Sequence, residues 1–159
     1  MEEPQQDNLF QIAHATLLLS SFQRWLGYPL LPEPDGSLLG TNVAQCLFEA
    51  PFVVVSHGTQ KDPIFNYGNR IALELFERTW SDFTSLPSRL SAEPINRAER
   101  ARLLQTVAAQ NYIDDYSGVR ISSSGQRFQI PKAIVWNVVD EAGIYRGQAA
   151  TFSNWEVLA

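Results

Sequence analysis

The spacing of hydrophobic residues changes after the first third of the chain. Over residues 9–26 the apolar side chains recur at helical spacing, and Asp7 or Asn8 can cap the helix they predict. Glycine and proline residues follow, which indicate an extended connector, and a short helix is expected over residues 42–49. We therefore expect an N-terminal helical extension over residues 1–51.

Beyond this extension the pattern is typical of strands. Residues 52–56 are apolar and β-branched, and residues 64–67 form a second short apolar run. In the last third, apolar-rich runs over residues 112–122, 127–140 and 145–152 are separated by turn residues, which predicts consecutive antiparallel strands.

Helical segments stand between these two groups of strands. Asn69 can cap a helix over residues 70–76, and shorter pieces are expected near residues 81–86 and 88–92. Strands at both ends with helices in the middle indicate an α+β domain over residues 52–159. Its five-stranded antiparallel sheet would be covered on one face by the helices.

The longest of these helices is expected to run to Gln110. Asn96 and Glu99 have the spacing of a capping box at its start. Three residues would form its buried side: Ala101, Leu104 and Ala108. Three arginines crowd the same helix: Arg97, Arg100 and Arg102. Glutamates dilute these charges and no aromatic residues interleave them, so the pattern favours a solvated, salt-bridged face over a nucleic-acid surface.

Composition narrows the class of protein further. The chain has 159 residues, of which 45% are hydrophobic and 18% charged, as expected of one folded domain. A net charge of −5 argues against nonspecific binding to phosphate backbones. The single cysteine, Cys46, excludes an internal disulfide and a cysteine-rich zinc site. An acidic, polar start and the lack of a long apolar run predict a cytoplasmic protein without a membrane segment.

Several long segments of the sequence resemble one known family. These segments are VVVSHGTQKDPIFNYGN, PSRLSAEP, YIDDYSGVRISSSGQRF and WNVVDEAGIYRGQAATFSNW. They are similar to the MEKHLA family of PAS-like domains, which occur alone in bacteria and at the C-terminus of plant class III homeodomain–leucine-zipper proteins. The resemblance implies a PAS-like sensory fold, and the fold alone does not assign a function.

Flavin-binding PAS relatives provide a residue-level test of the cofactor. Their photoactive motif is Asn-Cys-Arg-Phe, and here the resemblance places Pro87-Ser88-Arg89-Leu90 at that position. Ser88 thus replaces the reactive thiol, which excludes adduct chemistry. Arg89 and Gln148 match the residues that contact the flavin phosphate and ring, and Arg120 and Ile130 replace the two ring-edge amides. Flavin bound without an adduct stays open as a minor alternative.

Haem is the less favoured cofactor. Haem-binding PAS domains usually take a histidine from the long central helix, and residues 96–110 contain none. His57, which stands next to Gly58, is interpreted as a turn residue. The cofactor therefore stays unknown, and no metal site is assigned.

Three functions remain open from the sequence. The first is a sensor that binds a small organic ligand between sheet and helices and signals to an unidentified protein. Its candidate ligand-binding residues are Tyr67, Leu75, Arg89, Leu104, Tyr116, Trp136, Asn137 and Gln148. The second is a ligand-free interaction module, with a homodimer formed through Leu18, Phe22 and Trp25 of the N-terminal helix.

The third alternative is a small α+β enzyme. Asp114 and Asp115 are adjacent in a strand, so their side chains should point to opposite faces and one should point inward. That carboxylate beside Tyr116 would form an acid–base pair. We assign no catalytic residue and consider an enzyme the least favoured function.

Overall fold

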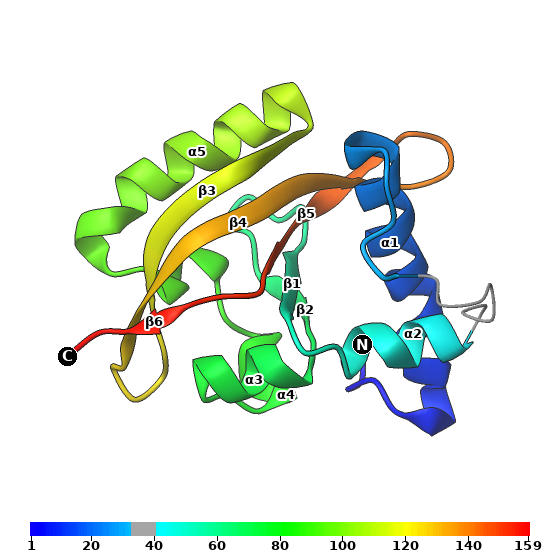
Figure 1. The fold of residues 1–159 in the computed structure, drawn as a ribbon, viewed down its shortest axis with the longest axis horizontal. Helices are drawn as coiled ribbons and strands as arrows, with labels where there is room; N and C mark the ends of the chain where they lie inside the picture. The colour runs from blue at the N-terminus through cyan, green and yellow to red at the C-terminus, as the bar shows by residue number, and fades with distance from the viewer. Residues whose placement is uncertain (33–40) are drawn as a thin grey trace.

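The computed structural model describes residues 1–32 and 41–159, so most of the expected connector lies outside the described residues. The helices are η1 (Gln6–Gln11), α1 (Ile12–Leu26), α2 (Thr41–Phe48), α3 (Arg70–Phe76), α4 (Trp80–Phe83), η2 (Ser88–Ser91), η3 (Pro94–Asn96) and α5 (Arg97–Gln110). The strands are β1 (Val53–His57), β2 (Phe65–Gly68), β3 (Tyr112–Ile121), β4 (Arg127–Val139), β5 (Tyr145–Phe152) and β6 (Glu156–Val157). Figure 1 shows their arrangement.

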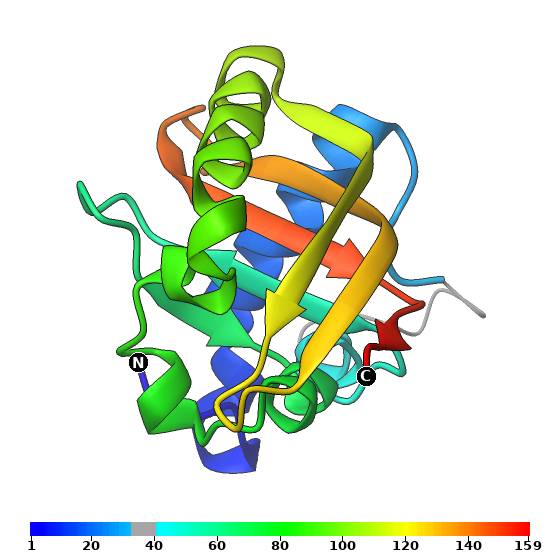
Figure 2. The same ribbon diagram turned by 90° about the vertical axis from the view of Figure 1, so that its left-hand side faces the viewer.

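One antiparallel sheet organises the molecule. Its strand order is β2-β1-β5-β4-β3, and the two-residue β6 pairs with β4. Figure 2 shows α5 in front of this sheet and α1 behind it. The α+β class and the five main strands are confirmed, and β6 is an addition that the sequence did not reveal.

Helix α1 packs an apolar stripe on the rear face of the sheet. Leu18 is 0% exposed and Phe22 is 1% exposed, and the Phe22 ring meets the Trp136 ring edge-on with centroids 5.0 Å apart. The Ser21 hydroxyl donates to the Val139 carbonyl and accepts from the Val139 amide. The apolar residues that the sequence offered for dimerisation therefore contact the chain's own sheet.

The start of α1 differs from the prediction. Leu9, Phe10 and Gln11 have positive φ, so the chain kinks within the last residues of η1, and the α-helix begins at Ile12. The expected cap at Asp7 or Asn8 is therefore wrong, because neither residue directly precedes the α-helix. The kink turns Phe10 into the core, where it is 8% exposed.

The two predicted asparagine caps had opposite outcomes. The Asn69 side chain accepts from the Ala72 amide at 3.3 Å and the Val54 amide at 3.0 Å, which confirms this cap and ties α3 to β1. The Asn96 cap is wrong, because the 3-10 turn η3 runs directly into α5. Asn96 already has near-helical φ and ψ, and its side chain makes no capping bond.

Gly147 allows β5 to lie close to β1. Its φ is +130°, and a Cβ placed on it would lie 2.0 Å from the His57 carbonyl oxygen. The pairing of β4 with β5 shifts register beside it, between Val138 and Val139. Only glycine fits this position without displacing the backbone.

Candidate functional site

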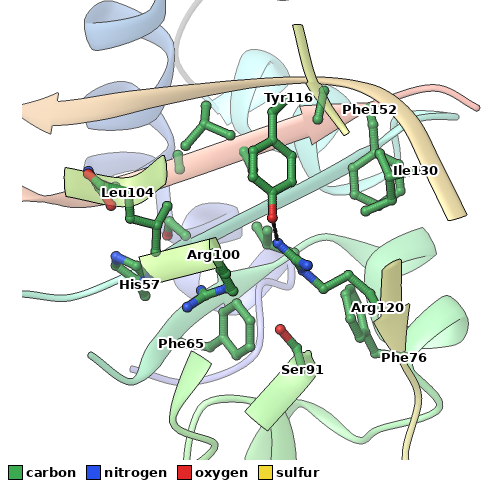
Figure 3. Close-up of a pocket in the computed structure, with 17 residues that line it drawn as sticks. His57, Phe65, Phe76, Ser91, Arg100, Leu104, Tyr116, Arg120, Ile130 and Phe152 are labelled. Carbon is green, nitrogen blue, oxygen red and sulfur yellow. Dashed lines mark hydrogen bonds between the residues drawn. The ribbon is translucent and has the colours of Figure 1, made fainter. Parts of the chain in front are cut away.

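A small cavity lies between the front face of the sheet and α5. About 60 Å³ of it is open to the centre of a water-sized sphere. Its polar wall contains His57, Ser91, Arg100, Tyr116, Arg120 and Gln148 (Figure 3). Its apolar wall contains Phe65, Phe76, Leu104, Ile130, Val135 and Phe152, among others. The described residues that line it include no aspartate or glutamate.

Two arginines enter the cavity from different elements. Arg100 comes from α5, is half-buried, and donates from Nη2 to the Ser88 hydroxyl at 3.1 Å. Arg120 comes from β3, is 9% exposed, and donates to the Val119 carbonyl and the Tyr116 hydroxyl. Its guanidinium also lies 5.2 Å from the centre of the Tyr116 ring. Burial, and then the charge of Arg120, lower the pKa of Arg100 to about 10, so it stays charged at neutral pH.

His57 is a neutral neighbour of these charges. It is 6% exposed, and its Nδ1 lies 2.8 Å from the Ser88 hydroxyl. Burial, and then the charge of Arg100, lower the pKa of His57 to about 4. The residue ends β1 instead of lying in the turn after it, so the interpretation as a turn residue is wrong.

A row of two amides connects the sheet to α5. Gln148 of β5 donates from Nε2 to the Leu104 carbonyl at 2.9 Å and to Asn137 Oδ1 at 3.2 Å. Asn137 of β4 donates in turn to the Ala108 carbonyl at 3.3 Å. The helix backbone is thereby bonded to two strands at the edge of the cavity.

The predicted ligand-binding residues are only partly brought together. Leu104, Tyr116 and Gln148 line the cavity, and Asn137 stands beside it in the amide row. The other four lie elsewhere: Tyr67, Leu75, Arg89 and Trp136. Tyr67 stacks on His14, Trp136 packs against Phe22, and Leu75 packs at the edge of the core. Arg89 pairs with Asp62 at 3.1 Å on the surface.

The two adjacent aspartates do not form the expected acid–base pair. Ile113 pairs with Val135 and Tyr116 pairs with Ala133, so the two aspartates of β3 lie opposite a single residue of β4, Ile134. This bulge breaks the alternation of side chains, and both Asp114 and Asp115 are exposed. The buried Tyr116 therefore has no inward carboxylate from either residue.

The sequence reasoning missed Arg100. We expected a solvated face, but Arg100 forms no ion pair within residues 1–32 and 41–159 and lines the cavity. Ala101 and Ala108 are exposed, and Val107 is the fully buried residue of α5. Helical spacing could have identified Arg100 as a cavity residue, because Arg100, Leu104 and Val107 fall on one side of the helix.

Neither a flavin nor a metal ion suits this site as it stands. Ligand cavities for drug-sized molecules measure roughly 300 Å³ or more, whereas this one offers about 60 Å³. Arg89, the match for the phosphate-binding arginine, does not line it. Within the described ranges, no three histidine, cysteine or carboxylate side chains gather to ligate a metal.

None of the helices in residues 1–32 and 41–159 has the length and apolar character needed to cross a membrane.

Comparison with solved structures defines the class of fold. The chain is similar to the PAS domain of a protein from Colwellia psychrerythraea, with a TM-score of 0.60 and 13% identity, over 69% of this chain and 90% of that one. It is also similar to the light-state dimer of the fungal blue-light photoreceptor Vivid, with a TM-score of 0.54 and 14% identity, over 84% and 91%. At such low identity these matches show a PAS-like fold alone.

The family follows from the sequence match. The MEKHLA domain matches residues 12–157, and the chain belongs to that family. The match begins in α1, before the domain boundary we predicted at residue 52. Homeobox-leucine zipper protein HOX29 of Oryza sativa, in subspecies indica and japonica, is 21% identical over 157 residues. That alignment covers 93% of this chain, which spans 18% of the length of these relatives.

Proposed function

We propose that this PAS-like domain is a sensor that binds a small organic ligand in the cavity between the sheet and α5. The observation that carries this proposal is the position of the cavity beside the row formed by Gln148 and Asn137. These amides bond the backbone of α5 at Leu104 and Ala108. A ligand that moves Leu104 or Gln148 would therefore change how α5 sits on the sheet, and a partner protein could detect that change.

Proteins of similar fold support a small ligand. One solved relative is the PAS domain, in complex with ethanol, of a LuxR-family transcriptional regulator from Burkholderia thailandensis. It has a TM-score of 0.53 and 16% identity to this chain. A two-carbon alcohol is of the size that a cavity of about 60 Å³ accepts.

Native mass spectrometry combined with thermal melting tests the sensor. We expect the purified chain to carry a co-purified small molecule, or to melt at a higher temperature with members of a chemically broad library, because a ligand that binds only the folded state stabilises it. A chain that shows its bare mass, and whose melting temperature no compound raises, would overturn the proposal.

The small volume of the cavity favours one second candidate, a ligand-free interaction module. In that case the contacts would come from exposed apolar side chains such as Ile95, which is 85% exposed, and Val157, which is 57% exposed. Homodimerisation through α1 would have to use the face of that helix opposite Leu18 and Phe22. Sedimentation of the full chain and of Ile95→Glu tests this candidate, and a monomer in both samples would reject self-association through Ile95.

A further inference from the structure

We propose that the ligand of this cavity is a small organic anion, a monocarboxylate with a short apolar tail, held by Arg100 and Arg120. This inference rests on the proposed function and specifies its ligand class. The two guanidiniums lie close enough for Arg120 to repel Arg100, and both residues line the same cavity (Figure 3).

Among the residues that the structure describes, no carboxylate pairs with the positive charge in the cavity. Four other arginines form ion pairs with carboxylates, and each of those pairs lies near the surface. In residues 1–32 and 41–159, neither Arg100 nor Arg120 forms such a pair. The chain as a whole carries a net charge of −5, so this local positive site stands against the overall charge.

The neighbouring polar groups do not replace a counterion. A guanidinium has five N–H donors, and in the part of the chain that the structure describes Arg100 has one bonded acceptor, the Ser88 hydroxyl. Arg120 donates to a carbonyl and to the Tyr116 hydroxyl, which are both uncharged. His57 is neutral at pH 7, because burial and Arg100 lower its pKa to about 4. A carboxylate between the arginines would offset one of the two positive charges and accept free N–H donors from both.

The rest of the wall determines the other end of the ligand. Phe65, Phe76 and Ile130 are at most 5% exposed and offer only carbon atoms to the cavity. A second carboxylate placed against them would lose its hydration without a partner. The volume of about 60 Å³ limits the tail to a few carbon atoms. These conditions select a short monocarboxylate over a dicarboxylate, a phosphate ester or a ring system.

Titration calorimetry of the full chain with butyrate, 1-butanol and n-butylammonium, at constant ionic strength, tests the charge requirement. The three probes have the same tail and differ in the head group. We expect butyrate to bind at least about tenfold more tightly than 1-butanol, because it pairs with two guanidiniums, and n-butylammonium not to bind. If 1-butanol binds as tightly as butyrate, the proposal of an anionic ligand is wrong. If chloride or phosphate displaces butyrate at equal concentration, the proposal of an organic monocarboxylate is wrong.

Arginine variants locate the binding site. Arg100→Met and Arg120→Met keep an unbranched side chain and remove the charge, and each should weaken butyrate binding at least about tenfold. Arg102→Met is the matched control, because Arg102 is on the same helix and exposed, and it should bind butyrate as the natural chain does. Equal affinity in all variants would overturn the assignment to these two residues. Should the variants fail to fold, the three-probe series on the natural chain decides the proposal.

Failure of this inference and failure of the proposed function give different results. If neutral compounds bind while butyrate does not, the cavity remains a ligand site and the anion is wrong. If butyrate fails and no library compound raises the melting temperature, both are wrong. Binding of butyrate that Arg102→Met retains and Arg100→Met loses supports both.

Discussion

The two faces of the sheet differ in what they bury. Behind the sheet, α1 packs Leu18 and Phe22 against Trp136, and these three side chains are at most 1% exposed. In front of it, α5 buries Val107 completely but turns Arg100 inward beside a cavity. The rear contact is made mainly by apolar side chains, whereas the front face contains two arginines, a pair of amides and a cavity.

This contrast indicates a division of roles. A tightly packed apolar interface stabilises the fold, because every buried methylene contributes to the free energy of folding. A face with unpaired cations and a cavity contributes less stability, and such features are typical of functional sites. The rear face should therefore dominate the free energy of unfolding, and the front face should respond to ligand.

The largest expected effect is at the rear face. Phe22→Ala should lower the free energy of unfolding by about 3–5 kcal/mol, because it leaves a hole against Trp136. Leu104→Ala, at the half-buried rim of the cavity, should cost only about 1–2 kcal/mol. Urea denaturation measures both. Equal losses for the two variants would refute the proposed division between the faces.

Acid should destabilise both faces, because each holds one histidine whose pKa is lowered in the fold. The pKa of His14 is lowered to about 4 by burial behind the sheet, and that of His57 to about 4 by burial and Arg100 in front. In the unfolded chain each takes up a proton near pH 6.5. The unfolded state thus binds more protons between these values, and stability falls as the pH drops from 7 to 5.

The expected loss is about 1–2 kcal/mol per histidine over this range. Urea denaturation at pH 7 and pH 5 measures it, and His14→Gln and His57→Gln should each remove about half of the pH dependence. An undiminished dependence in the double variant would show that other groups carry it. Glu77 and Asp140 do not interfere, because their pKa values are lowered by hydrogen bonds and they stay ionised at pH 5.

The amide row should hold α5 more than it holds the whole fold. Gln148→Met keeps the length of the side chain and removes its bonds to Leu104 and Asn137, at a cost of about 1 kcal/mol. Hydrogen exchange should accelerate in α5 and stay unchanged in α1. Exchange that accelerates equally in both helices would mean that the row does not act locally.

The smallest effect is expected at the bulge of β3. Asp114→Asn and Asp115→Asn should each change the free energy of unfolding by less than about 0.5 kcal/mol, because both side chains are exposed. The same urea titrations measure this. A loss of several kcal/mol in either variant would reveal a buried partner for that carboxylate.

The sequence predicted the elements better than the site. The order of helices and strands along the chain and the Asn69 cap followed from local patterns, because turn residues and a single side-chain bond determine them within a few residues. The bulge before Tyr116 depends on how β3 pairs with β4, which no local pattern contains. Helical spacing places Arg100 on the same side of α5 as Leu104 and Val107, which indicates that it faces the sheet. We nevertheless expected it to face solvent because its side chain is charged. Gln148 came from the family resemblance and does line the cavity.

Gly147 has a consequence for reading other sequences. Because a single added carbon would collide with the His57 carbonyl, a residue with any side chain here has to push β5 away from β1. Such a shift would separate His57 from Gln148, which stand opposite each other in the sheet. Glycine at this position is therefore a marker by which a chain sharing this front-face geometry can be told from one that shares only the topology.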